Sequence, residues 1–408
     1  MKSGNFRKFM LLWFGELISC IGGGLTSFGL GVYVFQKTGN ASSMALVTLL
    51  GFLPTILLRI PAGVLADRYD RRLLMIIGDS CSALGVIYIL ICMARGEATL
   101  AEICIGVFIS AVFSTLLEPA YQATITDLLT KEEYSKASGL VSIAGSSRYL
   151  FSPVIAGLLL SVADVKLLLI IDICTFFVTV TSAIVVKKSI HITKKVEKKE
   201  SFLSSVKDGW HALTARKGIL TLVLVSTAIT LFMGMFQILA EPLVLSFADA
   251  KTLGIAETVC ASGMLVSGVL LGIFGIKKSF VKILCVALAI AGLGMIGFGF
   301  FETIVPICLF GFLFFMALPF ANNCLDYLVR TNTPEEAQGR VWGLIGFITQ
   351  IGYIIAAALS GVAADALGSA TGLGVGRGAG MMILMSGICL AVIALALYAV
   401  KKVRALEV

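Results

Sequence analysis

The amino-acid sequence predicts an all-α polytopic membrane protein with twelve transmembrane helices in two six-helix bundles, and three observations support this. The chain of 408 residues is 58% hydrophobic and only 14% charged, and its mean hydropathy is +0.99, whereas a water-soluble surface needs far more charge. Its apolar stretches reach the length of about 20 residues with which a helix crosses a bilayer. They are continuously apolar, unlike the strands of a membrane barrel, which alternate over about ten residues.

The apolar stretches define the predicted spans in chain order. The first half contains spans at residues 9–35, 43–65, 73–94, 100–129, 134–162 and 166–186. The second half contains spans at residues 218–247, 254–276, 281–300, 303–330, 338–366 and 379–400. The first span is too long for the apolar core of a signal peptide, so we expect it to be retained as a helix. The predicted bundles cover residues 1–186 and 218–408.

The segment between the two predicted bundles, residues 187–217, is the main break in composition. A run rich in Lys and Glu at 194–200 is followed by Phe202, Val206 and Trp210 at helical spacing. We expect a cytoplasmic linker with an amphipathic helix at the membrane interface. The alternative is a regulatory or lipid-sensing element.

Positive charge predicts the orientation of the chain. Most of the 32 Lys and Arg residues lie at the N-terminus, in the loops that follow even-numbered spans and at the C-terminus. The positive-inside rule therefore places both termini in the cytoplasm, and we expect a multi-pass protein of the cell membrane. The net charge of +8 faces anionic lipid headgroups, so no nucleic-acid partner is predicted. The expected partner is the lipid bilayer, and the expected state is a monomer.

The two halves of the chain are related by an internal repeat at an offset of 200 residues. Pro119 and Gly139 in spans four and five are matched by Pro319 and Gly339 in spans ten and eleven. Two six-helix units inserted in the same direction form a parallel repeat, which supports rocking about a central cavity. This pattern predicts a transporter.

The loop between spans two and three reads Gly-Val-Leu-Ala-Asp-Arg-Tyr-Asp-Arg-Arg at residues 63–72. Such a loop can form charged contacts that hold the cytoplasmic side closed, although an ordinary positive-inside loop would carry similar charge. Asp79, close to the same end, is expected to join these salt bridges. The predicted cytoplasmic gate comprises Gly63, Asp67, Arg68, Arg71, Arg72, Asp127 and Arg340.

The spacing of this loop resembles the signature loop of the major facilitator superfamily, in which glycine is followed by Asp-Arg and then by Gly-Arg-Lys/Arg. Nearly the whole chain looks most like the macrolide-efflux-like branch, which also includes siderophore exporters. Supporting stretches lie at residues 13–19, 30–39, 334–341 and 374–378. The resemblance implies the major facilitator fold and secondary active export, commonly as a drug:proton antiporter.

Three features depart from the family pattern. Asp70 stands where the signature loop usually has glycine, and the equivalent loop of the second half, at 268–278, lacks the Asp-Arg pair. The antiporter motif of span five is reduced to Ser-Pro-Val-Ile-Ala-Gly at 152–157. Export is therefore implied more strongly than antiport.

Ionisable residues deep within spans are the candidates for coupling transport to an ion, because each costs roughly 2.5 to 3.5 kcal/mol to insert. Glu16, Glu118 and Arg148 lie at similar depths in spans one, four and five. The resemblance implies that spans one and four line the cavity, so we predict proton or substrate coupling at these three residues. The alternatives are a permanent Glu118 to Arg148 ion pair and a Glu16 bonded to backbone or to a serine hydroxyl.

The predicted cavity combines aromatic and amide side chains, which suits amphipathic organic molecules better than sugars. Plain helix packing is the alternative role for the aromatic members. The predicted cavity residues are Phe28, Tyr121, Gln122, Phe236, Gln237, Asn322 and Asn323.

Other classes of protein are disfavoured by missing motifs. The ten cysteines are scattered singly and both histidines, His191 and His211, lie in the central segment, so no disulfide, metal or other cofactor is predicted. Neither a hydrolase turn nor a complete phosphate-binding loop occurs, which argues against an enzyme and against an ATP-driven pump. The sequence predicts a secondary transporter, with proton-coupled efflux of amphipathic compounds by alternating access. A lipid or lysolipid flippase and a siderophore or metabolite exporter are the alternatives.

Overall fold

A computed structural model describes residues 3–130, 133–188, 210, 213–214, 217–333 and 338–407. Most of the predicted linker helix and residues 334–337 lie outside this part of the chain, as do the side chains of Asp67 and Arg340. In the described residues, eleven helices are long and apolar enough to cross a membrane, and the shorter apolar helix Ala41–Leu57 accompanies them. The prediction of an all-helical polytopic protein is confirmed.

The first six predicted spans correspond to helices whose ends lie within a few residues of the expected ones. Three spans are single helices, namely α1 (Ser3–Thr38), α4 (Arg71–Ala94) and α9 (Val165–Lys188). The others are helix pairs, namely α2 (Ala41–Leu57) with α3 (Arg59–Arg68), α5 (Leu100–Ser114) with α6 (Leu117–Leu128), and α7 (Tyr134–Leu150) with α8 (Ser152–Leu160).

Proline explains the interruption of the paired helices. Pro119 lacks the N–H that would donate to the carbonyl of Thr115, and its ring crowds that carbonyl. Thr115 (φ −59°, ψ −25°) and Leu116 (φ −72°, ψ −22°) nevertheless keep right-handed helical angles, so α5 and α6 form one kinked span. Pro153 lies at the start of α8 in the same way, directly after the break at Phe151.

The last six predicted spans are each a single helix. They are α11 (Lys217–Leu245), α12 (Ala250–Phe274), α13 (Phe280–Phe300), α14 (Ile304–Asn332), α15 (Gln338–Thr371) and α16 (Val375–Ala399). Pro319 lies inside the unbroken α14, although its repeat partner Pro119 lies just after a kink. Beyond α16, the short helix α17 (Lys401–Arg404) buries Val403, and the turn that follows places Leu406 O 2.9 Å from Asn332 Nδ2, which donates to it.

The helices gather into two compact units. The first unit contains the described residues of Met1–Gly39, Leu46–Lys194 and Asp249–Thr258, and the second contains those of Asn40–Ala45, Lys195–Ala248 and Val259–Val408. The predicted division at residues 186 and 218 stays a prediction.

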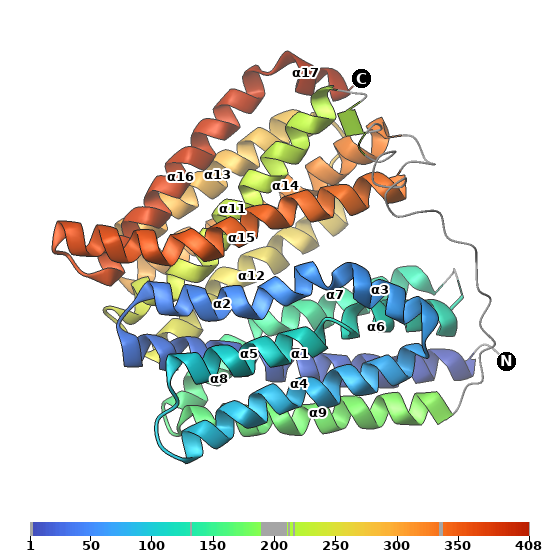
Figure 1. Ribbon diagram of the computed structural model, residues 1–408. Coiled ribbons are helices and arrows are strands. Elements are labelled where there is room, and N and C mark those ends of the chain that lie inside the picture. Colours follow the sequence, from blue (N-terminus) through green and yellow to red (C-terminus); the bar gives the residue numbers. More distant parts are fainter. Residues whose placement is uncertain are drawn as a thin grey trace. The chain divides into compact units, whose positions relative to one another are not determined.

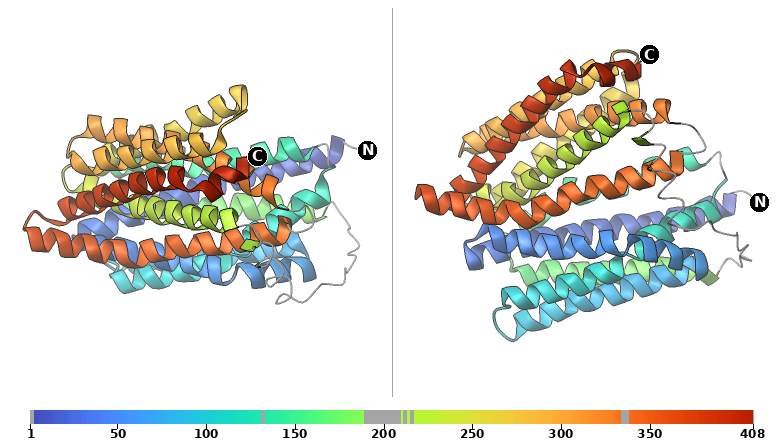
Figure 2. Two further views of the ribbon diagram at one scale, coloured as in Figure 1. Left: turned by 90° about the horizontal axis from the view of Figure 1, so that it is seen from above. Right: turned by 45° about the horizontal axis from the view of Figure 1, so that its top comes forward.

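Within the first unit, α9 packs along both α1 and α4, and α4 also packs along α5 (Figures 1 and 2). The contact between α4 and α5 depends on a pair of glycines, because a Cβ on Gly85 would collide with the carbonyl oxygen of Gly106. Within the second unit, α13 packs against α14 and α16, and α11 packs against α15. Small residues thus allow close helix contacts where packing rather than polarity holds spans together.

Candidate functional site

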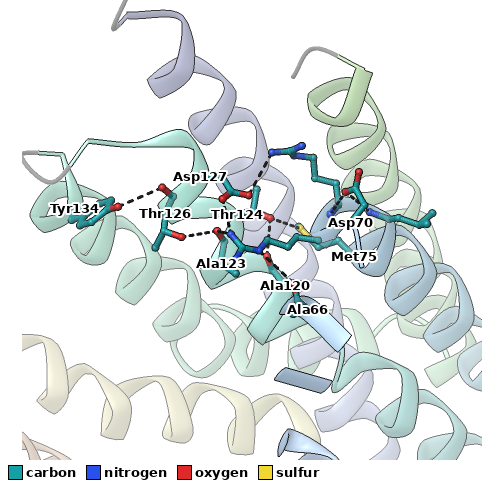
Figure 3. A network of polar contacts seen from close by, with 12 residues as sticks. Ala66, Asp70, Met75, Ala120, Ala123, Thr124, Thr126, Asp127 and Tyr134 are labelled. Atoms are coloured by element: carbon teal, nitrogen blue, oxygen red, sulfur yellow. Dashed lines mark hydrogen bonds and ion pairs between the residues drawn. The ribbon is translucent and has the colours of Figure 1, made fainter. Parts of the chain in front are cut away.

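A network of charged residues joins the start of α4 to the end of α6 (Figure 3). Arg71 Nη1 lies 2.6 Å from Asp127 Oδ1 and also donates to the carbonyl of Ala123 at 2.8 Å. The buried guanidinium of Arg72 places Nη2 3.7 Å from Asp127 Oδ2. One carboxylate at the end of α6 therefore forms a charge-assisted hydrogen bond with Arg71, which is stronger than a neutral one, and an ion pair with Arg72.

Asp70 has a structural role that explains its presence in the loop. Its Oδ1 accepts hydrogen bonds from the backbone N–H groups of Arg72 (2.9 Å) and Leu73 (3.3 Å), so it is the N-cap of α4. Aspartate is among the best residues at this position, because it satisfies otherwise unpaired N–H groups and faces the positive end of the helix dipole.

For the remaining predicted gate residues, the structure gives less evidence of a role in the loop network. Arg68 is exposed. A Cβ on Gly63 would have no atom of the described chain within 4 Å, so in this conformation no helix approaches closely at that glycine. The participation of Asp67 and Arg340 stays a prediction, because their side chains lie outside the described residues.

The interior of the first unit contains a second polar site, built from carboxylates on three helices. Glu16 lies on α1, Asp79 on α4 and Asp172 on α9, and Asp79 lies within electrostatic range of the other two. Asp79 and Asp172 are 1% and 2% exposed, and Glu16 is half-buried. Arg148 on α7 is the cation within electrostatic range of Glu16 and Asp172. We call Glu16, Asp79 and Asp172 the acidic cluster.

Among the described residues, Asp172 has a hydrogen-bond donor at its carboxylate and Asp79 has none. Thr175 Oγ1 lies 3.4 Å from Asp172 Oδ1, and it also donates to the backbone carbonyl of Asp172 at 2.7 Å. Neither carboxylate oxygen of Asp79 has a hydrogen-bond partner among the described residues. The expectation that Asp79 joins a gate salt bridge is therefore wrong, because its side chain is buried between helices rather than placed in the loop network.

A glycine on α1 makes room for this cluster. A Cβ on Gly22 would collide with Thr175 Oγ1 and lie 2.7 Å from Asp172 Oδ1. A Cβ on Gly23 would instead lie 3.9 Å from Arg148 Nη2, an ordinary contact. Gly22 is therefore the position at which α1 approaches the Asp172 side of α9.

The three residues predicted for coupling lie in different environments. Glu16 belongs to the acidic cluster and accepts a hydrogen bond from Cys20 Sγ at 3.6 Å. Glu118 is exposed and lies 3.4 Å from Arg59 Nη2, with both side chains more than half accessible. The structure thus pairs Glu118 with Arg59, and not with the Arg148 that the sequence suggested.

The predicted cavity residues divide into buried aromatics and accessible amides. Phe28, Tyr121 and Phe236 are buried, Gln237 is half-buried, and the accessible amides are Gln122, Asn322 and Asn323. Phe236 stacks on Phe314 with ring centroids 4.4 Å apart, which is a packing role within the second unit. The lining of a substrate cavity by these residues stays a prediction.

Sequence reasoning missed Asp172 and misplaced Asp79, although a signal was present. Asp79 follows Ile-Ile-Gly and Asp172 follows Ile-Ile in otherwise apolar runs. An ionisable residue inside such a run marks a functional site by default. Glu118 was selected by its depth along a predicted span. That depth does not show which acidic side chains lie near one another in the folded protein.

The comparison with known proteins agrees with this architecture. The profile of the Major Facilitator Superfamily matches residues 12–357, and the chain belongs to this superfamily. It is therefore a multi-pass membrane transporter, as the sequence predicted.

Relatives with assigned names cover most of the chain. It is 28% identical over 381 residues to Macrolide efflux protein A of Streptococcus pyogenes, which covers 90% of this chain and 92% of the relative. It is 24% identical over 361 residues to the Enterobactin exporter EntS of Escherichia coli O6:K15:H31, covering 86% and 84%. The crystal structure of a bacterial homologue of the iron transporter ferroportin, in an inward-facing state, has a TM-score of 0.76 at 14% identity, covering 97% of this chain and 99% of that one. This last likeness concerns the fold.

Proposed function

We propose that this protein is a secondary active exporter of amphipathic organic compounds, driven by protons and working by alternating access. The observation that carries the proposal is the similarity to Macrolide efflux protein A across 90% of the chain, through both predicted bundles. In this proposal the protein is a monomer in the cell membrane, with both termini in the cytoplasm as the distribution of Lys and Arg indicates.

The acidic cluster supports proton coupling. A secondary transporter needs a group that binds its driving ion in one state and releases it in another. Carboxylates inside the first unit, with Arg148 as the nearby cation, offer such groups. Glu16, Glu118 and Arg148 are the coupling residues of this proposal.

The loop network supports a gate at the end of the first unit where α4 begins. Arg71, Arg72 and Asp127 form a compact ion cluster that can break as a unit when the surrounding helices move. In the proposed orientation this end faces the cytoplasm.

Transport by purified protein tests the proposal. The protein is reconstituted in liposomes containing a pH dye, a proton gradient is imposed, and macrolides and lipophilic cations are added in turn. We expect a proton flux that depends on the added compound and on the gradient. Transport of a compound without any proton flux would refute the coupling, and failure of the whole panel would refute the substrate class.

A second candidate substrate class is siderophores, and the similarity to the Enterobactin exporter EntS favours it. The same vesicles loaded with an iron-free catechol siderophore decide between the two classes. Gradient-dependent siderophore efflux without macrolide transport would favour the second candidate. A parallel assay with a fluorescent phospholipid tests the flippase alternative.

A further inference from the structure

The acids of the first unit form a series of increasing burial. Glu118 on α6 is exposed, Glu16 on α1 is half-buried, and Asp79 on α4 is 1% exposed. Glu16 lies within electrostatic range of Glu118, and Asp79 lies within range of Glu16. Carboxylates on three helices, each within electrostatic range of the next, therefore extend from exposed Glu118 on α6 to buried Asp79 on α4.

Asp79 differs from its neighbours, because the described residues place neither a cation nor a hydrogen-bond donor at its carboxylate. Arg148 acts on Glu16 and Asp172, and Thr175 donates to Asp172. Both oxygens of Asp79 are buried without a hydrogen-bond partner among the described residues. An ionised carboxylate in such a place is strongly unfavourable, because burial removes its hydration and two further acids repel it.

A second buried group points to the same place. The Tyr121 hydroxyl on α6 is also buried without a partner among the described residues, and it lies within electrostatic range of Glu16 and Cys20. A hydroxyl both donates and accepts, so it can pass a proton between neighbouring groups. The titratable groups within electrostatic range of Asp79 are Glu16 and Cys20 on α1 and Asp172 on α9. Tyr121 on α6 and Arg148 on α7 lie within electrostatic range of Glu16.

The cluster suits a proton better than a metal ion. Metal sites need several ligand atoms converging on one point, and the described residues contain no group of three or more His, Cys, Asp or Glu side chains that could hold a metal ion. A proton needs only one oxygen.

We propose that Asp79 is the proton-carrying residue of the transport cycle, loaded in the conformation described here and reached through Glu16. This proposal rests on the proposed proton-driven transport, and Arg148, which lies within electrostatic range of Glu16 and Asp172, is the cation of the site. The proton leaves Asp79 when helix movement brings water or a cation to its carboxylate, and it returns when the site closes again.

Infrared spectroscopy of the full chain in lipid vesicles tests the loaded state without any substrate. We expect the carbonyl stretch of a buried carboxylic acid at neutral pH, and we expect it to disappear reversibly as the pH is raised. The variant Asp79→Asn loses this band, whereas Asp164→Asn, an exposed residue between α8 and α9, retains it. A wild-type band that persists at every pH, or one that survives in Asp79→Asn, overturns the proposal.

A transport assay distinguishes a proton-carrying role of Asp79 from a purely structural one. At zero membrane potential, a substrate exchanged for one proton accumulates about tenfold for each unit of pH difference. With a radiolabelled macrolide, we expect Asp79→Asn to abolish this accumulation while it still exchanges substrate at equal pH. Full gradient-driven accumulation by Asp79→Asn overturns the proposal, and so does accumulation driven by a sodium gradient in its place.

The two measurements distinguish the failure of this proposal from that of the proposed function. If wild-type protein moves none of the tested compounds, the substrate assignment fails while the band and its pH dependence still decide whether Asp79 holds an exchangeable proton. If Asp79→Asn does not fold, Asp79→Glu is used in its place, because it keeps a titratable acid at this position. We expect its carboxylic acid carbonyl stretch to be shifted from that of the wild type. Absence of any shift in Asp79→Glu contradicts the assignment.

Discussion

The contact between α1 and α9 at Gly22 allows a sharp prediction about stability. In the variant Gly22→Ala, the added Cβ collides with Thr175 Oγ1 and lies 2.9 Å from Thr175 Cγ2. Because both branches of the threonine crowd the new methyl group, rotation about χ1 replaces one collision by another. The Thr175 side chain cannot move away freely either, since its hydroxyl donates a hydrogen bond to the backbone carbonyl of Asp172 at 2.7 Å.

The expected cost of Gly22→Ala follows from overpacking. Inserting a methyl group into a filled contact costs about 1 to 3 kcal/mol, and the gain in helix propensity from Gly to Ala offsets up to about 1 kcal/mol of that. We expect a net destabilisation of up to about 2 kcal/mol, measured as a lower midpoint of thermal unfolding of the purified protein. Restoring space with Gly22→Ala/Thr175→Ser, which removes the Cγ2 branch, is expected to recover part of the loss.

Gly23→Ala is the matched control, since it makes the same chemical change one residue along the helix. Its Cβ would lie 3.9 Å from Arg148 Nη2, which is ordinary van der Waals contact. We expect it to be neutral or stabilising by up to about 1 kcal/mol. Equal unfolding midpoints for the two variants would refute the reasoning that α1 and α9 are in direct contact at Gly22.

Two further predictions concern the loop network and the strained turn before α13. Asp127→Asn removes the negative charge that pairs with Arg71 and the buried Arg72, and we expect the free energy of unfolding to fall by about 1 to 3 kcal/mol in a thermal unfolding assay. Glu118→Gln breaks an exposed ion pair and serves as the comparison. It should change the free energy of unfolding by less than about 1 kcal/mol. Ser279 has the left-handed angle φ 60° and makes no side-chain cap hydrogen bond, so Ser279→Gly is expected to stabilise the protein by about 1 kcal/mol. A fall in stability on that substitution would contradict the assignment of strain.

The spans could be predicted well because their signal is local. Each of α4, α13 and α16 is a continuous apolar run whose length alone marks a bilayer crossing, and the predicted ends lie within a few residues of those observed. The kinks are partly visible too, since Pro119 and Pro153 lack a backbone donor. The sequence does not show which proline interrupts a helix, because Pro319, at the position equivalent to Pro119, lies in an unbroken α14.

The candidate site was only partly predictable. Glu16 was identified because a glutamate inside the first apolar run is conspicuous, and Arg71 and Asp127 were identified as members of one charged network. The pairing of Glu118 with Arg59, at 3.4 Å, could not be predicted, since it depends on how two helices far apart in the sequence are rotated about their axes. The burial of Asp79 depends in the same way on the rotation of α4, whereas Asp70 caps α4 through local hydrogen bonds from Arg72 and Leu73.

The sequence by itself determined that this chain is a polytopic membrane protein of the Major Facilitator Superfamily, because hydrophobic length and the signature loop are properties of neighbouring residues. Only the tertiary structure decided which charges meet. Glu16, Asp79 and Asp172 come from α1, α4 and α9, and their proximity is created by packing between helices. Each carboxylate alone carries no information about its partners, so the acidic cluster exists as a site only in the folded protein.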